Sequence, residues 1–388
     1  MVITIFPGRL SGAVDAIPSK SMAHRYLICA ALSDGPTEII CPETSRDIES
    51  TVRCMNELGA QISRTKTGYS VLSIERIPAQ ATLNCGESGS TLRFLLPIAG
   101  ALGVDTTFVM EGRLSQRPLS PLWEEMERMG CCMSRPAKNT VRCTGKLQPG
   151  TYSIDGSVSS QFITGLLFAL SLIESPCHLE ITGTVGSKPY INVTRAAMEL
   201  FHAPHYHTPG TVKVEGDWSN GAFWLAANML GSDINVDSLD YGSIQGDRAI
   251  TGILPYMGNH CTVDASQIPD LVPILAVAAA CNNGAVFTNI QRLRLKESDR
   301  VAATVSMINS LGGRAEETED TLVIHGTGLT GGTVDSCNDH RIAMAAAIAA
   351  TVCNKPVTIL GADAVCKSYP KFWEDYRKLG GKYEQYLR

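Results

Sequence analysis

The sequence predicts a layered α/β protein of two domains, each assembled from three repeated units. Ala, Leu, Ile and Val dominate the chain and aromatic residues make up only 6% of it, as in proteins whose helices and sheets pack in layers. The length of 388 residues fits two or three domains of roughly 150 residues each. A short helix-ending pattern also recurs along the whole chain.

This pattern is an apolar-periodic helix that ends in Leu-Gly or Met-Gly, followed by a β-like segment. The six copies, two of them weaker, end at Gly59, Gly130, His202, Gly258, Gly312 and Gly380. Glycine can adopt the left-handed conformation that ends a helix. The spacings of 54 to 72 residues therefore favour two domains of three units. Because Leu-Gly helix ends are common in α/β proteins, a chance recurrence is the alternative.

The remaining elements follow from local pattern. Short β-like runs lie at 2–6, 107–110, 141–143, 178–181, 211–214 and 322–324, and helices are expected at 22–32, 162–172, 222–230 and 342–351. The stretch 215–221 is rich in turn residues and is the best linker candidate. A helix start is expected there at Ser219 or Asn220.

Composition excludes several classes of protein. The net charge of −5 argues against a nucleic-acid surface, which needs a basic stripe. Thirteen cysteines lie singly apart from Cys131–Cys132, with no Cys-x-x-Cys, so reduced thiols in a cytoplasmic protein are expected. The start lacks a signal-peptide pattern. The longest apolar run, near 342–353, is shorter than the ~20 residues that span a bilayer.

The most charged stretch runs from Arg292 to Arg300 and contains four basic residues and two carboxylates. Such a stretch is typical of an anion-binding site with an acid/base group, and equally of a solvated helix face. The segments 20–25, 86–93 and 338–341 repeat the combination of basic and polar residues. Together they favour a site for a small, multiply anionic ligand.

Gly86-Glu-Ser-Gly-Ser-Thr91 precedes a helical run that begins at Leu92. Two glycines can turn backbone N–H groups toward an anion, and the helix start adds its positive dipole end. Ser90 or Thr91 can equally be a helix N-cap and nothing more. The loop is not a P-loop, because no lysine follows the second glycine.

Lys20 and Arg25 flank the start of the helix expected at 22–32. Ser21 is expected to cap that helix, which leaves Lys20 outside the first turn and able to reach a ligand. The alternative is an exposed basic pair.

Three other segments combine polar side chains with a helix start or an apolar run. Ser157–Gln161 suits a phosphate contact, although an ordinary N-terminal cap is the better interpretation of that segment alone. Asp270 stands beside an apolar run, where a charge needs a partner or a function. Asn338–Arg341 again puts polar groups and an arginine at a helix start.

His202, His205 and His207 stand close together in the sequence. Their spacing crosses a helix end, and metal sites need convergent ligands. A solvated corner between helix and strand is therefore the better interpretation, and no metal site is expected.

Taken in order, these segments resemble the 5-enolpyruvylshikimate-3-phosphate synthases (3-phosphoshikimate 1-carboxyvinyltransferases). The likeness extends over nearly the whole chain, through 20–25, 86–93, 117–118, 159–161, 187–190, 296–300, 338–341 and Lys367. It implies two domains, each of three βαβαββ-like units with helices inside and sheets outside, joined by a double crossover. The implied domains are 1–18 plus 219–388, and 19–218, with the active site in the cleft between them.

The resemblance also implies an activity: transfer of the enolpyruvyl group of phosphoenolpyruvate to the 5-hydroxyl of shikimate 3-phosphate, by addition and elimination. No metal or organic cofactor, nucleic acid or membrane is implied, and a cytoplasmic monomer is expected. The implied catalytic residues are Glu297, Asp270 and Lys20, without an assignment of acid and base. Two carboxylates and two phosphates arrive with the substrates, which explains a cationic site.

The residues implied to bind shikimate 3-phosphate are Lys20, Ser21, Arg25, Ser159, Ser160, Gln161, Ser187, Tyr190, Asp270 and Lys296. Those implied to bind phosphoenolpyruvate are Lys20, Gly89, Arg93, Arg117, Gln161, Arg300, His340, Arg341 and Lys367. One position departs from the family: Glu87 stands where many members carry asparagine. A carboxylate there would repel phosphate unless it turns away or pairs with an arginine.

Two alternatives remain at this point. The sister carboxyvinyltransferases that act on UDP-N-acetylglucosamine usually carry a reactive cysteine in the loop that matches 111–118, and this chain has none there. The second alternative is a non-catalytic anion-binding or RNA-end-binding relative. The presence of Glu297, Asp270 and Lys20 argues against a non-catalytic relative. The acidic net charge argues against an RNA-end-binding relative.

Overall fold

The computed structural model describes residues 1–386 and divides them into two compact units. The first unit contains Met1–Ile17 and the chain from Glu215 onward, and the second contains Pro18–Val214. The predicted boundaries lay one and four residues further along the chain. The residues 215–218 belong to the first unit because the Asp217 N–H donates to the Ile17 carbonyl at 2.7 Å and the Asp217 side chain caps the next helix.

The elements of the second unit are α1 (Lys20–Ala31), β3 (Thr37–Ile40), α2 (Arg46–Glu57), β4 (Gln61–Arg64), β5 (Gly68–Leu72), β6 (Gln80–Asn84), α3 (Gly89–Leu102), β7 (Asp105–Val109), η1 (Gly112–Gln116), α4 (Leu122–Arg128), β8 (Cys131–Ser134), β9 (Thr140–Gly145), β10 (Thr151–Asp155), α5 (Ser160–Leu170), β11 (His178–Thr182), α6 (Lys188–Leu200) and β12 (Thr211–Lys213).

The elements of the first unit are β1 (Val2–Phe6), β2 (Ser11–Asp15), α7 (Trp218–Met229), β13 (Asp233–Asp237), η2 (Gly246–Ala249), α8 (Ile250–Ile253), η3 (Leu254–Tyr256), β14 (Cys261–Asp264), α9 (Val272–Ala280), β15 (Ala285–Thr288), η4 (Gln291–Leu295), α10 (Arg300–Ser310), β16 (Arg314–Glu317), β17 (Thr321–His325), β18 (Gly332–Asp335), α11 (His340–Ala349), β19 (Val357–Leu360), η5 (Ala362–Lys367), α12 (Phe372–Lys378) and β20 (Lys382–Tyr386).

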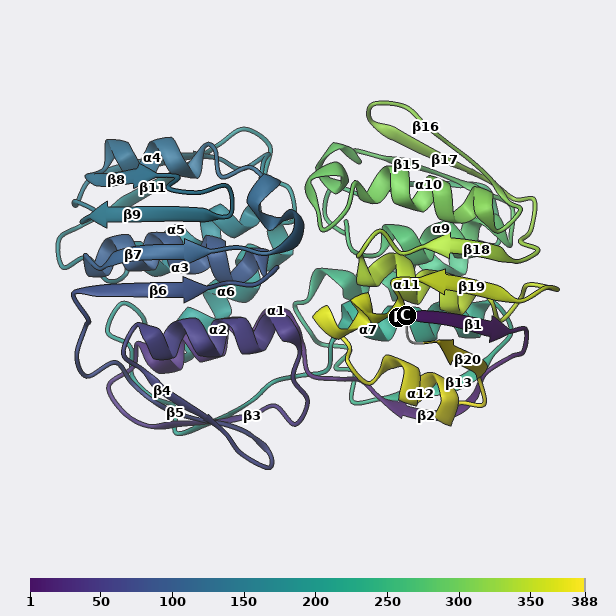
Figure 1. Cartoon of the computed structure of the whole chain (residues 1–388), viewed down its shortest axis with the longest axis horizontal. Coiled ribbons are helices and arrows are strands. Elements are labelled where there is room, and N and C mark those ends of the chain that lie inside the picture. The colour runs from purple at the N-terminus through teal and green to yellow at the C-terminus, as the bar shows by residue number, and fades with distance from the viewer. Residues whose placement is uncertain (387–388) are drawn as a thin grey trace. The chain divides into compact units, whose positions relative to one another are not determined.

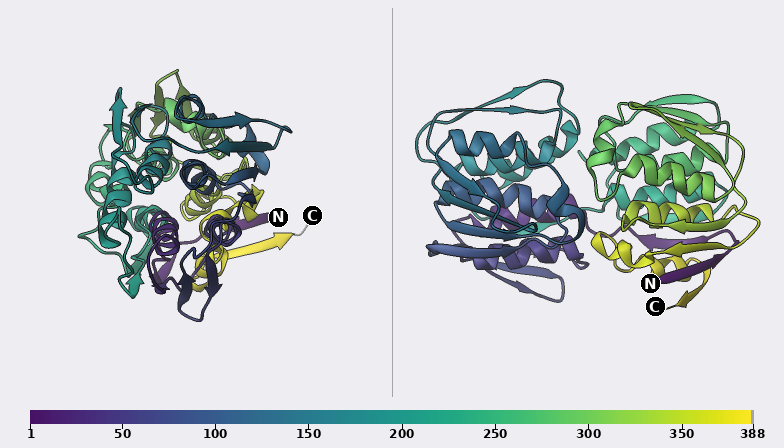
Figure 2. Two further views of the ribbon diagram at one scale, coloured as in Figure 1. Left: turned by 90° about the vertical axis from the view of Figure 1, so that its left-hand side faces the viewer. Right: turned by 45° about the horizontal axis from the view of Figure 1, so that its top comes forward.

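Four of the sheets share one topology, in which a parallel pair is extended by two antiparallel strands. Their strand orders are β6-β7-β9-β8, β12-β3-β5-β4, β14-β15-β17-β16 and β18-β19-β1-β20. A two-stranded parallel sheet completes each unit, β10-β11 in the second and β13-β2 in the first. In each unit the sheets lie on the outside and the most buried helices run inside (Figure 1, Figure 2). The α/β class with three repeats in each unit is confirmed.

Four of the six repeats make the same connection between a strand and the helix that follows it. The side-chain oxygens of Asn84, Asp155, Asp264 and Asp335, at the ends of β6, β10, β14 and β18, each accept a hydrogen bond from the backbone N–H two residues later, at 2.8–2.9 Å. This Asx turn reverses the chain out of the strand and into the helix. The same Asx turn therefore leads into a helix at four equivalent places in the chain.

The helix-ending pattern is also largely confirmed. Gly59, Gly130, Gly312 and Gly380 have φ between 82° and 106°, and His202 adopts the same left-handed region at φ 54°. Gly258 does not, and that prediction was wrong. Helix α7 of the first unit also ends in a Leu-Gly pair, at Gly231 with φ 98°. This copy of the pattern was not identified from the sequence.

Three helices hold the following strand through an asparagine. Asn56, Asn228 and Asn309 each accept the N–H and donate to the C=O of one residue, six positions on, at 2.7–3.1 Å. The two bonds fix the angle between the end of the helix and the start of the strand. This explains why asparagine stands two positions before the leucine at the end of each of these three helices.

All four helices expected from the sequence begin earlier than predicted; α5 and α11 begin at Ser160 and His340, each two residues before the predicted start. Helix α7 begins at Trp218 with Asp217 as its N-cap, before the predicted Ser219 or Asn220. Helix α1 begins at Lys20 with Ser19 at the cap position, so Ser21 is not the cap and Lys20 lies inside the first turn. In α7 and α1 the polar residue nearest the turn takes the cap position, two or three positions before the residues that the sequence indicated.

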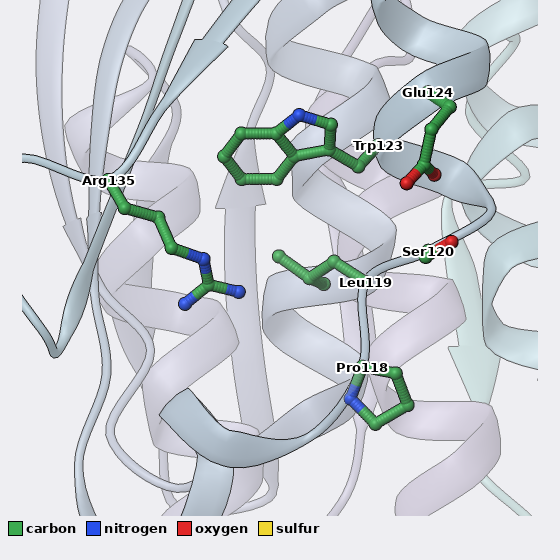
Figure 3. Close-up of a pocket in the computed structure, with 6 residues that line it drawn as sticks. All are labelled: Pro118, Leu119, Ser120, Trp123, Glu124 and Arg135. Carbon is green, nitrogen blue, oxygen red and sulfur yellow. The ribbon is translucent and has the colours of Figure 1, made fainter.

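An open pocket of about 500 Å³ lies in the second unit (Figure 3). It is lined by Pro118, Leu119, Ser120, Trp123, Glu124 and Arg135. These residues come from the segment after η1, from α4 and from the turn after β8.

All thirteen cysteines are free thiols. Within residues 1–386, no helix combines the length and apolar character needed to cross a bilayer.

The contact between α3 and α5 generates a stability prediction. Pro97 lies inside α3 and has no N–H to donate to the carbonyl of Arg93. Helix α5 approaches that carbonyl through Gly165, where an added Cβ would lie 2.2 Å from the Arg93 oxygen. We therefore expect Gly165→Ala to destabilise the second unit by about 1–3 kcal/mol through overpacking.

Differential scanning calorimetry with urea unfolding would measure this loss. Gly252→Ala is the matched control, because an added Cβ in α8 meets no atom within 4 Å. A Gly165→Ala protein as stable as the control would contradict the close helix contact.

Candidate functional site

In the second unit, the loop 86–91 forms a tight turn into α3. Gly86 has φ 55°, and its N–H donates to Asn84 at 2.9 Å. Ser88 is the N-cap of α3 and accepts from the Thr91 N–H at 3.2 Å, so neither Ser90 nor Thr91 caps the helix as expected. The loop thus brings backbone N–H groups to the start of a 14-residue helix, where an anion is favoured.

Gly89 lies between two arginines. A Cβ at this position would lie 2.6 Å from Nη1 of Arg117 and 2.7 Å from Nη1 of Arg93. Only glycine therefore allows both guanidinium groups to rest against the first turn of α3. This convergence of Gly89, Arg93 and Arg117 brings together three of the residues predicted to hold phosphoenolpyruvate.

Gln161 joins the same cluster from α5. Its Oε1 accepts from Arg93 at 3.1 Å, and its Nε2 donates to Ser90 at 3.0 Å. Arg93 also donates to the Pro118 carbonyl at 3.1 Å. The Arg93 side chain is only 3% exposed, so its direction is fixed by these acceptors.

The carboxylate of Glu87 lies against η1, because a Cβ added at Gly112 would meet Glu87 Oε2 at 2.4 Å. The side chain therefore extends along the loop toward residue 112. A carboxylate at position 87 is compatible with an anionic ligand if it turns away from the ligand or pairs with an arginine. The direction toward residue 112 fits the first of these conditions.

A buried chain of hydrogen bonds ties this loop to α1 and α2. His24 Nδ1 pairs with the Thr51 hydroxyl, Thr51 with Thr91, and Thr91 with Ser88, each at 2.7 Å. Burial, with the nearby charges of Lys20 and Arg25, lowers the pKa of His24 well below its usual value. A neutral His24 thus links the helix that carries Lys20 to the helix start of the anion loop.

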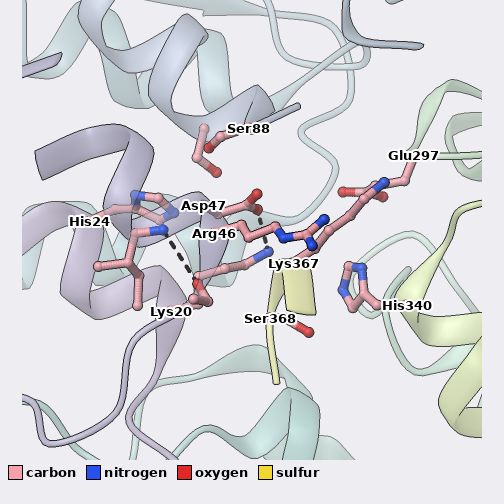
Figure 4. A network of polar contacts seen from close by, with 12 residues as sticks. Lys20, His24, Arg46, Asp47, Ser88, Glu297, His340, Lys367 and Ser368 are labelled. Atoms are coloured by element: carbon pink, nitrogen blue, oxygen red, sulfur yellow. Dashed lines mark hydrogen bonds and ion pairs between the residues drawn. The ribbon is translucent and has the colours of Figure 1, made fainter. Parts of the chain in front are cut away.

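Lys20 forms an ion pair with Asp47 of α2, with 2.8 Å between Nζ and Oδ2 (Figure 4). The two side chains are 15% and 12% exposed. Asp47 lies in the first turn of α2, which is capped by Ser45. The carboxylate holds the lysine ammonium at the start of α1, close to the His24 chain.

Arg25 is buried, and three of its nitrogens donate within the second unit. The acceptors are the Thr194 hydroxyl at 2.8 Å and the carbonyls of Ser21 at 2.6 Å and Tyr190 at 3.0 Å. Burial lowers the pKa of Arg25 to about 10. The structure therefore joins Arg25 to Ser21 and Tyr190, with Arg25 acting as the link between α1 and α6.

Ser159, Ser160 and Ser187 lie at the starts of α5 and α6. Ser159 caps α5 and accepts from the Gln161 N–H at 3.3 Å, which confirms the capping interpretation of that segment. Ser187 precedes α6 in a left-handed conformation with φ 54°. A non-glycine residue in this region is uncommon.

In the first unit, Arg300 is the centre of a buried ion cluster. Its side chain is 1% exposed and contacts three carboxylates: Asp270 at 2.7 Å, Glu297 at 2.6 Å and Asp339 at 2.9 Å. Burial alone would lower the pKa of Arg300, and these carboxylates raise it above its usual value. The guanidinium thus fixes the positions of two predicted acid/base candidates, Asp270 and Glu297.

Asp270 is the most heavily compensated carboxylate in this cluster. Besides Arg300, it lies 3.4 Å from Lys296 Nζ and 3.6 Å from Arg341 Nη2. Burial lowers the pKa of Lys296, against the opposing effect of Asp270. Three cations therefore surround this partly exposed carboxylate and stabilise its ionised form.

The highly charged stretch 292–300 divides between two surfaces. Lys296, Glu297 and Arg300 join the buried cluster, whereas Arg294 donates to Glu317 at 2.6 Å and to the Thr318 carbonyl of the neighbouring hairpin. Asp299 is the N-cap of α10. Part of the stretch is thus buried in an ion cluster and part lies on the surface, and anion binding by this stretch stays a prediction.

The start of α11 and the end of η5 supply the remaining predicted residues. Asp339 caps the helix and accepts from the Arg341 N–H at 2.9 Å. Arg341 donates to the Ser219 carbonyl at 2.8 Å, and Lys367 donates to the Asn338 carbonyl at 2.6 Å. His340, Glu297 and Lys367 appear together in Figure 4. Asn338 and Cys337 are both in the left-handed region.

Asp247 is a buried carboxylate that the sequence did not single out. It is 3% exposed and accepts from the Ser219 hydroxyl. Burial, together with Asp270 and Asp217, raises the pKa of Asp247 to about 6, against the opposing effects of Ser219 and Arg341. Asp247 therefore shares Arg341 and Ser219 with the buried cluster.

Sequence reasoning also missed Asp47 and Asp339 as partners of Lys20 and Arg300. Asp339 lies inside the segment 338–341, which the sequence singled out. Its role as the partner of Arg300 depends on a contact across 39 positions of the chain. Asp47 had no local signal, because its partner is 27 positions away.

The histidines behave as predicted for a solvated corner. His207 pairs with Asp34 while both side chains are more than half exposed. Among residues 1–386, no group of three or more His, Cys, Asp or Glu side chains could hold a metal ion.

Comparisons with known proteins agree with this picture. The family model of EPSP synthase (3-phosphoshikimate 1-carboxyvinyltransferase) matches residues 6–376. A 3-phosphoshikimate 1-carboxyvinyltransferase of Clostridium kluyveri is 39% identical over 419 residues, covering 99% of this chain and 98% of the relative. One from Clostridium perfringens strain 13 is 40% identical, covering 98% of each. The EPSP synthase structure of Acinetobacter baumannii has the same fold, with a TM-score of 0.77 at 23% identity, covering 99% of this chain and 100% of that one.

The raised pKa of Asp247 generates a pH prediction. The folded state holds a proton that the unfolded chain releases near pH 4, so this group's contribution to stability falls as the pH rises from about 4 to about 6. Asp247→Asn keeps an acceptor for Ser219 and removes the titration. We expect the variant to gain up to about 3 kcal/mol relative to the parent between pH 4 and pH 7.

Urea unfolding at both pH values would measure this difference, with the exposed Asp233→Asn as the charge-removal control. A difference between variant and parent that is the same at both pH values would show that folding does not raise the pKa of Asp247.

Proposed function

Since the chain belongs to the EPSP synthase (3-phosphoshikimate 1-carboxyvinyltransferase) family, we propose that it transfers the enolpyruvyl group of phosphoenolpyruvate to the 5-hydroxyl of shikimate 3-phosphate and releases phosphate. The observation that carries this proposal is the placement of Arg93 and Arg117 against Gly89. Two fixed guanidinium groups at a helix start suit a small ligand with a phosphate and a carboxylate. The chain acts as a cytoplasmic monomer in this proposal.

We assign the phosphoenolpyruvate-binding residues to both units. In the second unit they are Lys20, Gly89, Arg93, Arg117 and Gln161, and in the first they are Arg300, His340, Arg341 and Lys367. The cations compensate the ligand charges that would otherwise repel one another. Arg300, already paired with three carboxylates, acts chiefly by positioning Asp270 and Glu297.

The residues assigned to shikimate 3-phosphate are Lys20, Ser21, Arg25, Ser159, Ser160, Gln161, Ser187, Tyr190, Asp270 and Lys296. Hydroxyls at the starts of α5 and α6 suit a phosphate group. Arg25 makes three internal hydrogen bonds, so we assign it mainly to holding Tyr190 and Ser21 in place.

The reaction needs one proton acceptor and one proton donor. As the 5-hydroxyl oxygen bonds to C2 of phosphoenolpyruvate, its proton must leave and a proton must reach the C3 methylene. Elimination then breaks the C2–O bond to phosphate and returns the C3 proton. We assign Asp270 to the hydroxyl, because three neighbouring cations stabilise its ionised form. Glu297 is assigned to the methylene: it must first take up a proton from solvent in place of part of its ion pair to Arg300, and it then gives that proton to C3 and takes a proton back on elimination. Lys20 assists at the phosphate.

Phosphate release from phosphoenolpyruvate tests the reaction and the site. We expect release with shikimate 3-phosphate and none with UDP-N-acetylglucosamine. Lys20→Ala and Glu297→Ala are expected to lower kcat by a factor on the order of 10²–10⁴, as for the loss of a proton-transfer group. The exposed Lys138→Ala and Glu319→Ala are the matched controls.

Release with the nucleotide sugar alone would assign the chain to the sister reaction. Silence with both acceptors, or full activity in the Lys20 and Glu297 variants, would contradict the proposal.

The division of the assigned residues between two units predicts a conformational change. Anionic ligands attract cations of both units, so their binding should draw the units together by hinge motion at the two crossovers. We expect small-angle scattering to record a smaller radius of gyration with both ligands than with either alone or neither. An unchanged radius with saturating ligands would contradict closure.

A further inference from the structure

We propose that the pocket beside Pro118 binds a small zwitterion with an apolar side chain, such as a free amino acid, and that this ligand alters phosphoenolpyruvate binding through Pro118. The pocket is a feature of the second unit alone. Its volume of about 500 Å³ lies within the range of small-molecule sites.

The floor of the pocket is apolar. It is formed by Leu119, which is 3% exposed, with Pro118 and the partly buried indole of Trp123. Figure 3 shows the indole plane and the Leu119 side chain facing the same space. A flat or branched apolar group of a ligand would gain contact area here, and an aromatic ring would also stack against the indole.

Opposite charges lie on the two sides of this floor. The Arg135 guanidinium extends toward the pocket from the turn after β8, and the Glu124 carboxylate comes from α4 on the other side (Figure 3). Arg135 lies 5.6 Å from the Trp123 ring centre, and its hydrogen bond to the Ser115 carbonyl is long, at 3.4 Å. Its N–H groups can therefore still donate to a ligand carboxylate.

Glu124 differs from its neighbour on α4. Glu125 is buried and bonded to Arg128 and to the Ser153 N–H, which explains it as a structural residue. Within residues 1–386, Glu124 makes no hydrogen bond or ion pair. Its carboxylate is thus available to a ligand ammonium group at the edge of the pocket.

This arrangement selects a class of ligand. A purely anionic ligand would meet repulsion from Glu124, and a purely cationic one from Arg135. A zwitterion can place its carboxylate on Arg135, its ammonium on Glu124 and its side chain on Leu119 and Trp123. Charge-assisted contacts at both ends would fix its orientation.

The coupling to the anion cluster runs through a single residue, Pro118. Pro118 lines the pocket, and its carbonyl accepts the hydrogen bond from Arg93 at 3.1 Å. Arg117 precedes it in the chain, and both arginines rest against Gly89. A ligand that shifts Pro118 therefore moves an acceptor of Arg93 and the backbone next to Arg117. This second part of the inference rests on the proposed function, and the binding part does not.

Isothermal titration calorimetry of the full chain with L-phenylalanine, without substrates, tests the binding. We expect saturable binding that weakens about tenfold in Arg135→Gln and in Glu124→Gln. The amide of phenylalanine should lose affinity for the parent but be insensitive to Arg135→Gln. N-acetylphenylalanine should likewise be insensitive to Glu124→Gln. Lys138→Gln, in the same hairpin, and Glu127→Gln, on the same helix, should bind as the parent does.

Absence of binding at millimolar concentration would overturn the site, and so would equal affinity of all variants for all three probes. The coupling is tested by the KM for phosphoenolpyruvate, which should change with L-phenylalanine in the parent and not in Arg135→Gln. Intact binding with an unchanged KM would overturn the coupling. An inactive enzyme that still binds the probe would contradict the proposed function and leave the pocket established.

Discussion

Compensation of buried charge is the constraint on which the first unit depends. Arg300 is almost fully buried, and an unpaired guanidinium there would be very costly. Asp270, Glu297 and Asp339 neutralise it, and Asp339 also caps α11. The same contacts therefore hold the segment 296–300, the start of α11 and the two acid/base candidates in fixed positions. Catalytic geometry and local stability share one set of ion pairs here.

The repeated connection between strand and helix explains where the candidate residues lie. Asn84, Asp155 and Asp335 each make an Asx turn after a strand, and each is followed by a capped helix. The starts of α3, α5 and α11 carry the polar groups assigned to substrates. The same local turn thus places several of the assigned polar groups at equivalent positions, each at the start of a helix.

Much of this could be predicted from local sequence, and the remainder depended on distant partners. The glycine helix ends at 59, 130, 312 and 380 identified the repeats because a left-handed φ is a local requirement. The sequence could not predict that Arg294 forms a surface ion pair and Arg300 a buried one. The difference depends on distant partners, Glu317 for Arg294 and Asp339 for Arg300. Asp247 and Asp47 were missed for the same reason: burial and long-range pairing leave no periodic signal.

The sheet β18-β19-β1-β20 places the first strand of the chain between two of its last. Val2 pairs with both Leu360 and Tyr386, so this sheet cannot close until nearly the whole chain has left the ribosome. The second unit is contiguous in sequence and has no such dependence. During synthesis, β1 and β2 must therefore remain unpaired while residues 18–214 fold. The connectivity thus sets the order in which the two units fold. Until β19 and β20 are synthesised, the unpaired edges of β1 can pair with strands other than their native partners.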